Sequence, residues 1–169
     1  MLIRKEIQRN LRTLGFVGVF VLTMFISVAQ AEQICDFTFC VSLNIEVVSD
    51  SEELRIATFQ GQGIVLDNLG KKLFHNMTFH LVGVARDMFG KRYRYGFVKF
   101  MDPDGDFVFT ENIALPDEKE GRFKFLLGTG KWKGIKGEGK VLAITSGKPI
   151  KPGTTQTCWK LTGTFELAK

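Results

Sequence analysis

Few side chains in this sequence have the types and spacing that catalysis or metal binding requires. His75 and His80 lie five residues apart, and on a strand that spacing places them on opposite faces. With three cysteines and two histidines in the whole chain, a structural zinc site is disfavoured. Serine, histidine and aspartate all occur, but no strand-turn-helix nucleophile motif accompanies them. We therefore predict neither a bound metal ion nor a cofactor.

Two short motifs imitate ligand-binding loops and fail in detail. Residues 134–140 approach a phosphate-binding loop, but Val141 stands where Ser or Thr should bind magnesium, and the following segment is strand-like. Residues 102–106 alternate aspartates like the start of an EF-hand, yet they lack the glycine and the glutamate that calcium binding needs further along. The same residues suit a type I turn, with a loosely bound calcium ion as the lesser alternative.

Six side chains could contact a ligand or move a proton if the chain encloses a lumen. Carboxylate, imidazole and phenol groups are common proton donors and acceptors in active sites. Aromatic rings supply apolar contact area. The candidates are Tyr93, Tyr95, Phe97, Glu111, His80 and Glu138. We assign no catalytic residue among them.

Alternation of apolar and polar residues recurs along the chain and predicts strands rather than helices. The predicted strands cover residues 37–47, 54–66, 73–85, 92–101, 106–113, 122–127, 139–145 and 155–167. Turn signals rich in Gly, Pro, Asn and Asp separate several of them. In the fourth strand, Tyr93, Tyr95 and Phe97 alternate with Arg92 and Arg94, and we expect the aromatic face to point inward.

These elements predict an all-β fold, an antiparallel closed barrel of about eight strands. Sixteen Phe and eighteen Gly fit such a fold. Closure into a barrel removes exposed strand edges. The interior of a barrel of this size can be filled by side chains or can hold one small ligand. A β-sandwich is the alternative.

The odd number of cysteines predicts one disulfide and one remaining thiol. In the first strand the apolar odd positions face inward, so Cys40 faces outward. The same parity in the last strand places Cys158 outward. First and last strands are neighbours in a closed barrel, so a Cys40–Cys158 bridge is geometrically sensible. Cys35 would be a free thiol near a flexible terminus, or the alternative partner.

The run from residue 128 to residue 139 is the most distinctive stretch of the chain. Its five glycines cannot belong to a helix interior, where each costs about 1 kcal/mol relative to alanine. We expect them to bend a strand or to let two backbones approach closely. The glycines in question are Gly128, Gly130, Gly134, Gly137 and Gly139. Four lysines in 131–140 fit a solvated loop better than a polyanion site.

This glycine run, together with the hairpin at 102–106, resembles the allene oxide cyclase and dirigent superfamily of small β-barrels, in particular its bacterial secreted members. The resemblance covers about residues 36–168. It implies a small antiparallel barrel with an apolar lumen, and association of identical chains into a homo-oligomer. Leu127 stands where a further glycine is common, and the acidic residues of cyclases and dirigent proteins have no counterpart. The resemblance therefore implies a fold and carries over no catalytic residue.

Residues 1–31 have the three parts of a secretory signal peptide. Basic residues precede an apolar stretch at 14–26, and Ala29–Ala31 forms a small-residue cleavage site. An uncleaved anchor is the alternative, since residues 13–29 are just long enough to span a membrane. We expect a single barrel domain at 32–169, secreted or periplasmic, with no membrane contact after cleavage. The predicted signal peptide contains four basic residues and one acidic residue, a net charge of +3. Residues 32–169 therefore have a net charge of +2, out of +5 for the whole sequence, and this low charge disfavours nucleic-acid binding.

Three functions remain open from the sequence. The first is binding of a small apolar molecule in the lumen. The second is a structural or interaction protein whose barrel is packed with its own phenylalanines. The third, least favoured, is a cyclase or isomerase in which a carboxylate or histidine moves a proton. An open cavity without a buried carboxylate would indicate the first, a packed core the second, and a cavity with a buried carboxylate the third.

Overall fold

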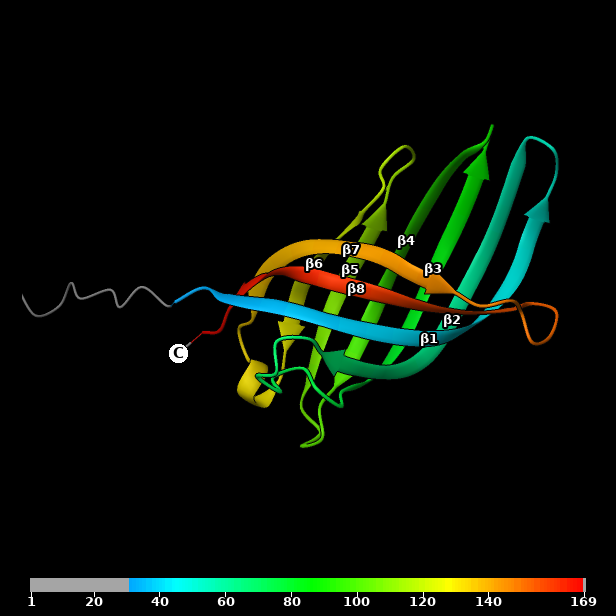
Figure 1. The fold of residues 1–169 in the computed structure, drawn as a ribbon. Helices are drawn as coiled ribbons and strands as arrows, with labels where there is room; N and C mark the ends of the chain where they lie inside the picture. The colour runs from blue at the N-terminus through cyan, green and yellow to red at the C-terminus, as the bar shows by residue number, and fades with distance from the viewer. Residues whose placement is uncertain (1–30, 169) are drawn as a thin grey trace, which may run out of the picture. The chain divides into compact units, whose positions relative to one another are not determined.

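The computed structural model describes residues 31–168, which form eight antiparallel strands and one short 3-10 helix. The strands are β1 (Gln33–Asp50), β2 (Leu54–Asp67), β3 (Thr78–Met88), β4 (Lys91–Met101), β5 (Phe107–Ala114), β6 (Gly121–Gly128), β7 (Lys136–Ser146) and β8 (Thr154–Glu166), and the helix is η2 (Gly130–Trp132). Each strand pairs with the next along the chain, and β1 also pairs with β8, which closes the barrel (Figure 1). The predicted eight-stranded closed barrel is confirmed, and the sandwich alternative is wrong.

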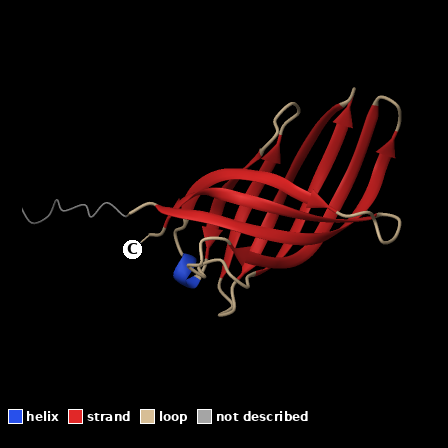
Figure 2. Cartoon of the chain, in the orientation of Figure 1, coloured by secondary structure: helices blue, strands red, loops and turns tan. Residues whose placement is uncertain are grey.

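The two ends of the barrel differ. The turns that join β1 to β2, β3 to β4, β5 to β6 and β7 to β8 lie at one end, called here the hairpin end (Figure 2). Helix η2 and the loop at 68–77 lie at the other, called here the plugged end. No helix among residues 31–168 is long and apolar enough to cross a membrane.

Aromatic side chains fill the plugged end. Phe74, from the loop, and Trp132, from η2, are both buried, and their ring centroids lie 5.0 Å apart. Phe74 also packs against Phe37 of β1 at 4.9 Å and Phe165 of β8 at 5.5 Å. The strand expected at 73–85 begins only at Thr78, because residues 73–77 fold inward as part of this plug.

Asp102 anchors η2 to the turn between β4 and β5. Its carboxylate accepts hydrogen bonds from Trp132 Nε1 at 2.9 Å, and from the backbone N–H groups of Asp104 and Asp106 at 2.9 and 3.0 Å. Lys131 Nζ lies 2.8 Å from the same carboxylate and 2.8 Å from that of Asp104. The predicted turn is present, since the N–H of Gly105 donates to the carbonyl of Asp102. Lys131 thus places one positive charge within ion-pair distance of both carboxylates.

Glycines let β7 approach β8 closely. At Gly137, φ is +143°, and an added β-carbon would overlap the Thr164 carbonyl oxygen. At Gly139 a β-carbon would overlap the Thr162 carbonyl oxygen. Only glycine fits two such backbones without displacement. The preceding residues form η2 rather than a continuous bent strand.

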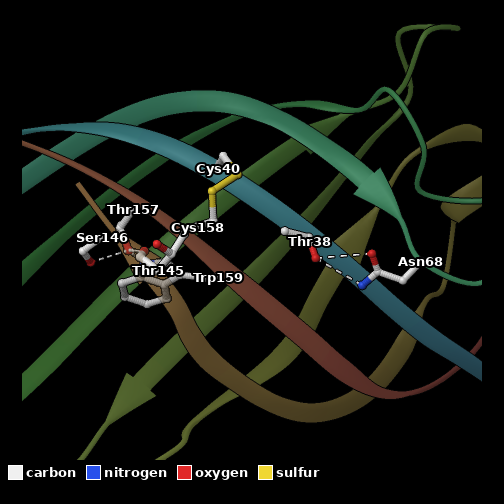
Figure 3. The surroundings of a disulfide bond; sticks show 8 residues. All are labelled: Thr38, Cys40, Asn68, Thr145, Ser146, Thr157, Cys158 and Trp159. Carbon is white, nitrogen blue, oxygen red and sulfur yellow. Dashed lines mark hydrogen bonds between the residues drawn. A yellow bond between two sulfur atoms is a disulfide. The ribbon is translucent and has the colours of Figure 1, made fainter.

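The disulfide joins Cys40 of β1 to Cys158 of β8, which are direct partners in the strand register (Figure 3). This confirms the predicted pairing. Cys35 is free and only 1% exposed. It lies within β1 opposite Gly163, rather than near a flexible terminus. Apart from Ala31, the expected signal peptide lies outside the described residues.

Candidate functional site

A cavity of about 370 Å³ occupies the lumen towards the hairpin end. Side chains from β1, β2, β3, β4, β7 and β8 line it, and it lies within the size range of small-molecule pockets. The apolar part of its lining is Leu43, Ile45, Ala57, Phe59, Ala85, Ala143 and Trp159. The polar part is Arg55, Asp87, Arg92, Arg94, Ser146, Thr155 and Thr157.

Small residues create this space. Ala57, Ala85 and Ala143 face inward at positions where a large side chain would fill the cavity. Gly83 serves a related purpose, since a β-carbon there would overlap the ring of Phe59. The ring can therefore lie across β3 and form part of the cavity floor. The plugged end, by contrast, presents Phe and Trp side chains at the corresponding inward positions.

A second, smaller apolar recess of about 40 Å³ adjoins the main cavity. Phe59, Arg94 and Trp159 line both spaces. The recess is otherwise enclosed mainly by apolar side chains, including Phe39, Leu81, Val98 and Val141. A ligand in the main cavity would thus meet Arg94 and Trp159 at the boundary between the two spaces.

Arginines and aspartates surround the mouth of the cavity. Asp87 accepts hydrogen bonds from Arg92 Nε at 3.3 Å and from a terminal nitrogen of the same guanidinium at 3.1 Å. Arg55 Nε lies 3.6 Å from the carboxylate of Asp50. Both pairs are substantially solvent-exposed, and such pairs contribute little to stability.

Arg94 is the remaining cation of the lumen. Its guanidinium carbon lies 5.4 Å from the centre of the Trp159 ring, within the range of a cation–π contact. Partial burial and, to a lesser extent, the positive charge of Arg92 lower the pKa of Arg94. No carboxylate among residues 31–168 forms an ion pair with it.

Hydroxyl groups on the opposite wall are largely engaged with each other. Trp159 Nε1 donates to Thr157 Oγ1 at 2.9 Å, and Thr157 donates to the Thr145 carbonyl at 2.8 Å (Figure 3). Ser146 Oγ also lies 3.1 Å from Thr157 Oγ1. This chain fixes the orientation of the Trp159 indole, so that its ring face forms a rigid part of the cavity wall.

The six side chains predicted to line the lumen lie on the outer wall instead. Tyr95 and Phe97 are 43% and 39% exposed, and the Tyr95 hydroxyl donates to Glu111 Oε1 at 2.7 Å across the outside of β4 and β5. The guanidinium carbon of the outward-facing Arg86 lies 4.4 Å from the centre of the Tyr93 ring. His80 and Glu138 occupy outward positions on β3 and β7, opposite Lys99 and Thr164. The expected inward orientation of these residues is wrong, although Tyr95 also borders the small recess.

The register of β4 explains the reversal. Val98 pairs with Leu81 and Phe100 pairs with Phe79, and all four side chains are buried in the lumen. Because alternate residues share a face, Arg92 and Arg94 must point inward with Val98 and Phe100. From the sequence, the aromatic residues of the first half of β4 were expected in the lumen. The sequence did not reveal that Arg94, Phe59 and Trp159 line one cavity together. Gly96 lies on the same face of β4 as Arg94 and Val98, and a glycine within a strand often marks a close approach to a neighbour, so it was a sequence indication of the inward face.

The backbone is similar to two solved pterocarpan synthase dirigent proteins. One has a TM-score of 0.53 over 83% of this chain and 99% of its own, and the other 0.52 over 83% and 90%, each at 9% sequence identity. A pyocyanin demethylase aligns over 73% of this chain and 98% of its own at 14% identity, with a TM-score of only 0.37. No protein-family model matches the sequence, and no curated protein matches it. The chain has the dirigent-like small β-barrel fold; at this identity the likeness extends to fold alone.

Proposed function

We propose that this dirigent-like barrel is a binding module that takes one small, mainly apolar molecule into its lumen. The observation that carries the proposal is the cavity of about 370 Å³, with Phe59 and Trp159 as its aromatic walls. An apolar pocket with a few converging polar groups is the usual form of a small-molecule site. The disulfide is compatible with an extracellular or periplasmic location, to which the predicted signal peptide would direct the protein.

The cavity supports binding over catalysis. The carboxylate that lines it is Asp87, which is partly exposed at the rim and paired with Arg92. A carboxylate that moves protons is more often held apart from a cation, in a setting that raises its pKa towards neutrality. The packed-barrel alternative fits the plugged end, where Phe37, Phe74 and Trp132 fill the lumen, but not the hairpin end.

A neutral fluorescent probe tests the proposal. Phenylnaphthylamine, an apolar aromatic amine whose emission rises in apolar surroundings, should bind the purified protein at a single saturable site. Ala85→Phe, which places a ring in the cavity, should weaken binding at least about tenfold, because the ring occupies the volume the probe needs. The matched control is Val84→Phe on the outer wall, where the side chain is 43% exposed. Unchanged binding by Ala85→Phe, in a variant that melts cooperatively, would show that the lumen is not the site.

A second candidate function is self-association through the outer wall. Val82, Val84, Tyr95 and Phe97 form a contiguous apolar stripe on β3 and β4, each about 40% exposed. Exposed apolar patches of this kind mark interaction surfaces on many soluble proteins. Sedimentation analysis of the wild type and of Phe97→Lys distinguishes this candidate, since the substitution would shift an oligomer towards monomer while leaving probe binding in the lumen unchanged.

A further inference from the structure

We infer that the lumen selects an organic anion, and that Arg94 is the residue that binds its charged group. The inference rests on the proposed function and names the chemical class of the ligand: a compact carboxylate or sulfonate with an apolar, ring-bearing body. Three observations carry it, namely the charge balance at the mouth, the surroundings of Arg94 and the apolar walls beside it.

The charge balance leaves one cation without a partner. Of the arginines that line the cavity, Arg92 is paired with Asp87 at 3.1 Å, and Arg55 lies 3.6 Å from Asp50. Arg94 has neither an ion pair nor a hydrogen-bond acceptor among the side chains of residues 31–168. Guanidinium remains charged at neutral pH even where its surroundings disfavour the charge. The site therefore contains a positive charge that the described residues leave uncompensated.

The position of Arg94 suits an anion that enters from the mouth. On β4 it lies two residues from Arg92, further from the turn, and it pairs in register with Ala85, whose small side chain leaves space in front of it. Its guanidinium carbon lies 5.4 Å from the centre of the Trp159 ring, which places the cation beside an aromatic wall of the cavity. A planar guanidinium offers its parallel N–H groups to a carboxylate or sulfonate in two-point contact. The cavity walls partly desolvate Arg94 although its side chain stays accessible from the mouth, so such a contact would be less screened than one on the open surface.

The walls beside Arg94 suit the apolar part of such a ligand. Phe59 and Trp159 border both the main cavity and the recess, and Leu81 and Val98 enclose the recess behind them. A ring that lies against Phe59 would leave its acidic group beside Arg94. A simple inorganic anion would gain the charge contact alone, and a neutral hydrocarbon only the apolar one. The arrangement therefore favours a molecule that has both.

Two probes with one scaffold test the inference. Anilinonaphthalene sulfonate carries the same rings as phenylnaphthylamine and adds a sulfonate, so the ratio of their dissociation constants measures the contribution of the charge. The wild type should bind the sulfonate at least about tenfold more tightly than the neutral amine. Arg94→Gln should reduce that preference to within about twofold while retaining the neutral amine. Arg94→Lys, which keeps the charge but loses the two-point geometry, should retain part of the preference.

Arg86→Gln provides the matched control. Arg86 stacks on Tyr93 at 4.4 Å, as Arg94 stacks on Trp159, but on the outer wall of the barrel. This variant should keep the full preference for the sulfonate. Equal binding of the two probes by the wild type would overturn the inference and leave the apolar lumen in place, whereas binding of neither would remove the proposed function as well. A preference that survives Arg94→Gln, in a variant with wild-type circular dichroism and melting, would place the anion elsewhere and overturn the inference.

Discussion

Asp102 joins the turn between β4 and β5 to helix η2 at the plugged end. Its side chain is 2% exposed and accepts hydrogen bonds from Trp132, from Lys131 and from two backbone N–H groups. Asp102→Asn removes the charge and one acceptor from these donors while preserving the shape of the side chain. We expect the free energy of unfolding at pH 7 to fall by about 2 kcal/mol, the scale of a hydrogen bond to a charged group. Urea denaturation measures the loss.

The pH dependence of this effect has a definite sign. Burial raises the pKa of Asp102, but hydrogen bonds from Lys131 and Trp132, together with the charge of Lys131, outweigh it and hold the pKa below the ordinary value of 3.8. The stabilisation is therefore complete above the unfolded-state pKa and is lost as pH falls through the lower folded-state pKa. The difference between wild type and Asp102→Asn should be constant near neutrality and shrink below about pH 4. Asp104→Ala, whose side chain is 74% exposed, should change stability by less than about 0.5 kcal/mol throughout.

At the scale of the element, β7 shows what glycine contributes to the barrel. Gly137→Val should lower the free energy of unfolding by more than about 2 kcal/mol, because the added side chain meets the Thr164 carbonyl and the backbone has φ of +143°. Lys136→Ala, one residue earlier and exposed, should stay within about 0.5 kcal/mol of wild type. Thermal and urea melts of the two variants make the comparison. Wild-type melting by Gly137→Val would mean that β7 can move away from β8 at little cost.

The strands also show how far the sequence could specify the fold. The alternation of inward and outward residues placed Cys40 and Cys158 on the outside of neighbouring strands, and the disulfide confirms it. This worked because β1 and β8 each have one clearly apolar face. Strand β4 has no such face: Tyr93 and Tyr95 precede Lys99 on one side, and Arg94 precedes Val98 on the other. Its orientation is fixed by pairing with β3, which is information that lies outside the strand itself. Arg92 and Arg94 line the cavity and interrupt the apolar pattern of the inward face of β4, so the alternation was least informative there.

Trp132 shows the same limit for a loop-borne residue. It lies in a glycine-rich segment without strand periodicity, yet it is completely buried and forms part of the plug. Phe74 is similar, since the alternation beginning at residue 73 suggested a strand although the backbone there folds inward as a loop. The number of strands could be predicted from their local patterns. The closure of one end depends on contacts between loops distant in sequence, which no local pattern encodes.

At the scale of the whole molecule, the two ends of the barrel differ in packing, and the proposed function assigns stability to one end and binding to the other. The plugged end contains a continuous aromatic cluster in which Phe74 contacts Phe37, Trp132 and Phe165, with centroids 4.9 to 5.5 Å apart. The hairpin end encloses a cavity instead, and its walls are held by the strand ladder and by the disulfide between β1 and β8. A closed end with tight packing can stabilise the fold while the other end stays accessible to a ligand.

This division predicts unequal costs for removing the two tryptophans. Trp132→Ala leaves a cavity in a completely buried cluster and leaves the Asp102 carboxylate without one donor, so the free energy of unfolding should fall by about 3–5 kcal/mol. Trp159→Ala removes a ring that already borders open space, and its cost should be less than half as large. Binding of the naphthalene probes should show the reverse order, with Trp159→Ala weakening it strongly and Trp132→Ala leaving it nearly unchanged at temperatures where that variant remains folded. Equal losses of stability for the two variants, in urea denaturation followed by far-ultraviolet circular dichroism, would mean that the cavity wall carries as much of the fold as the plug does.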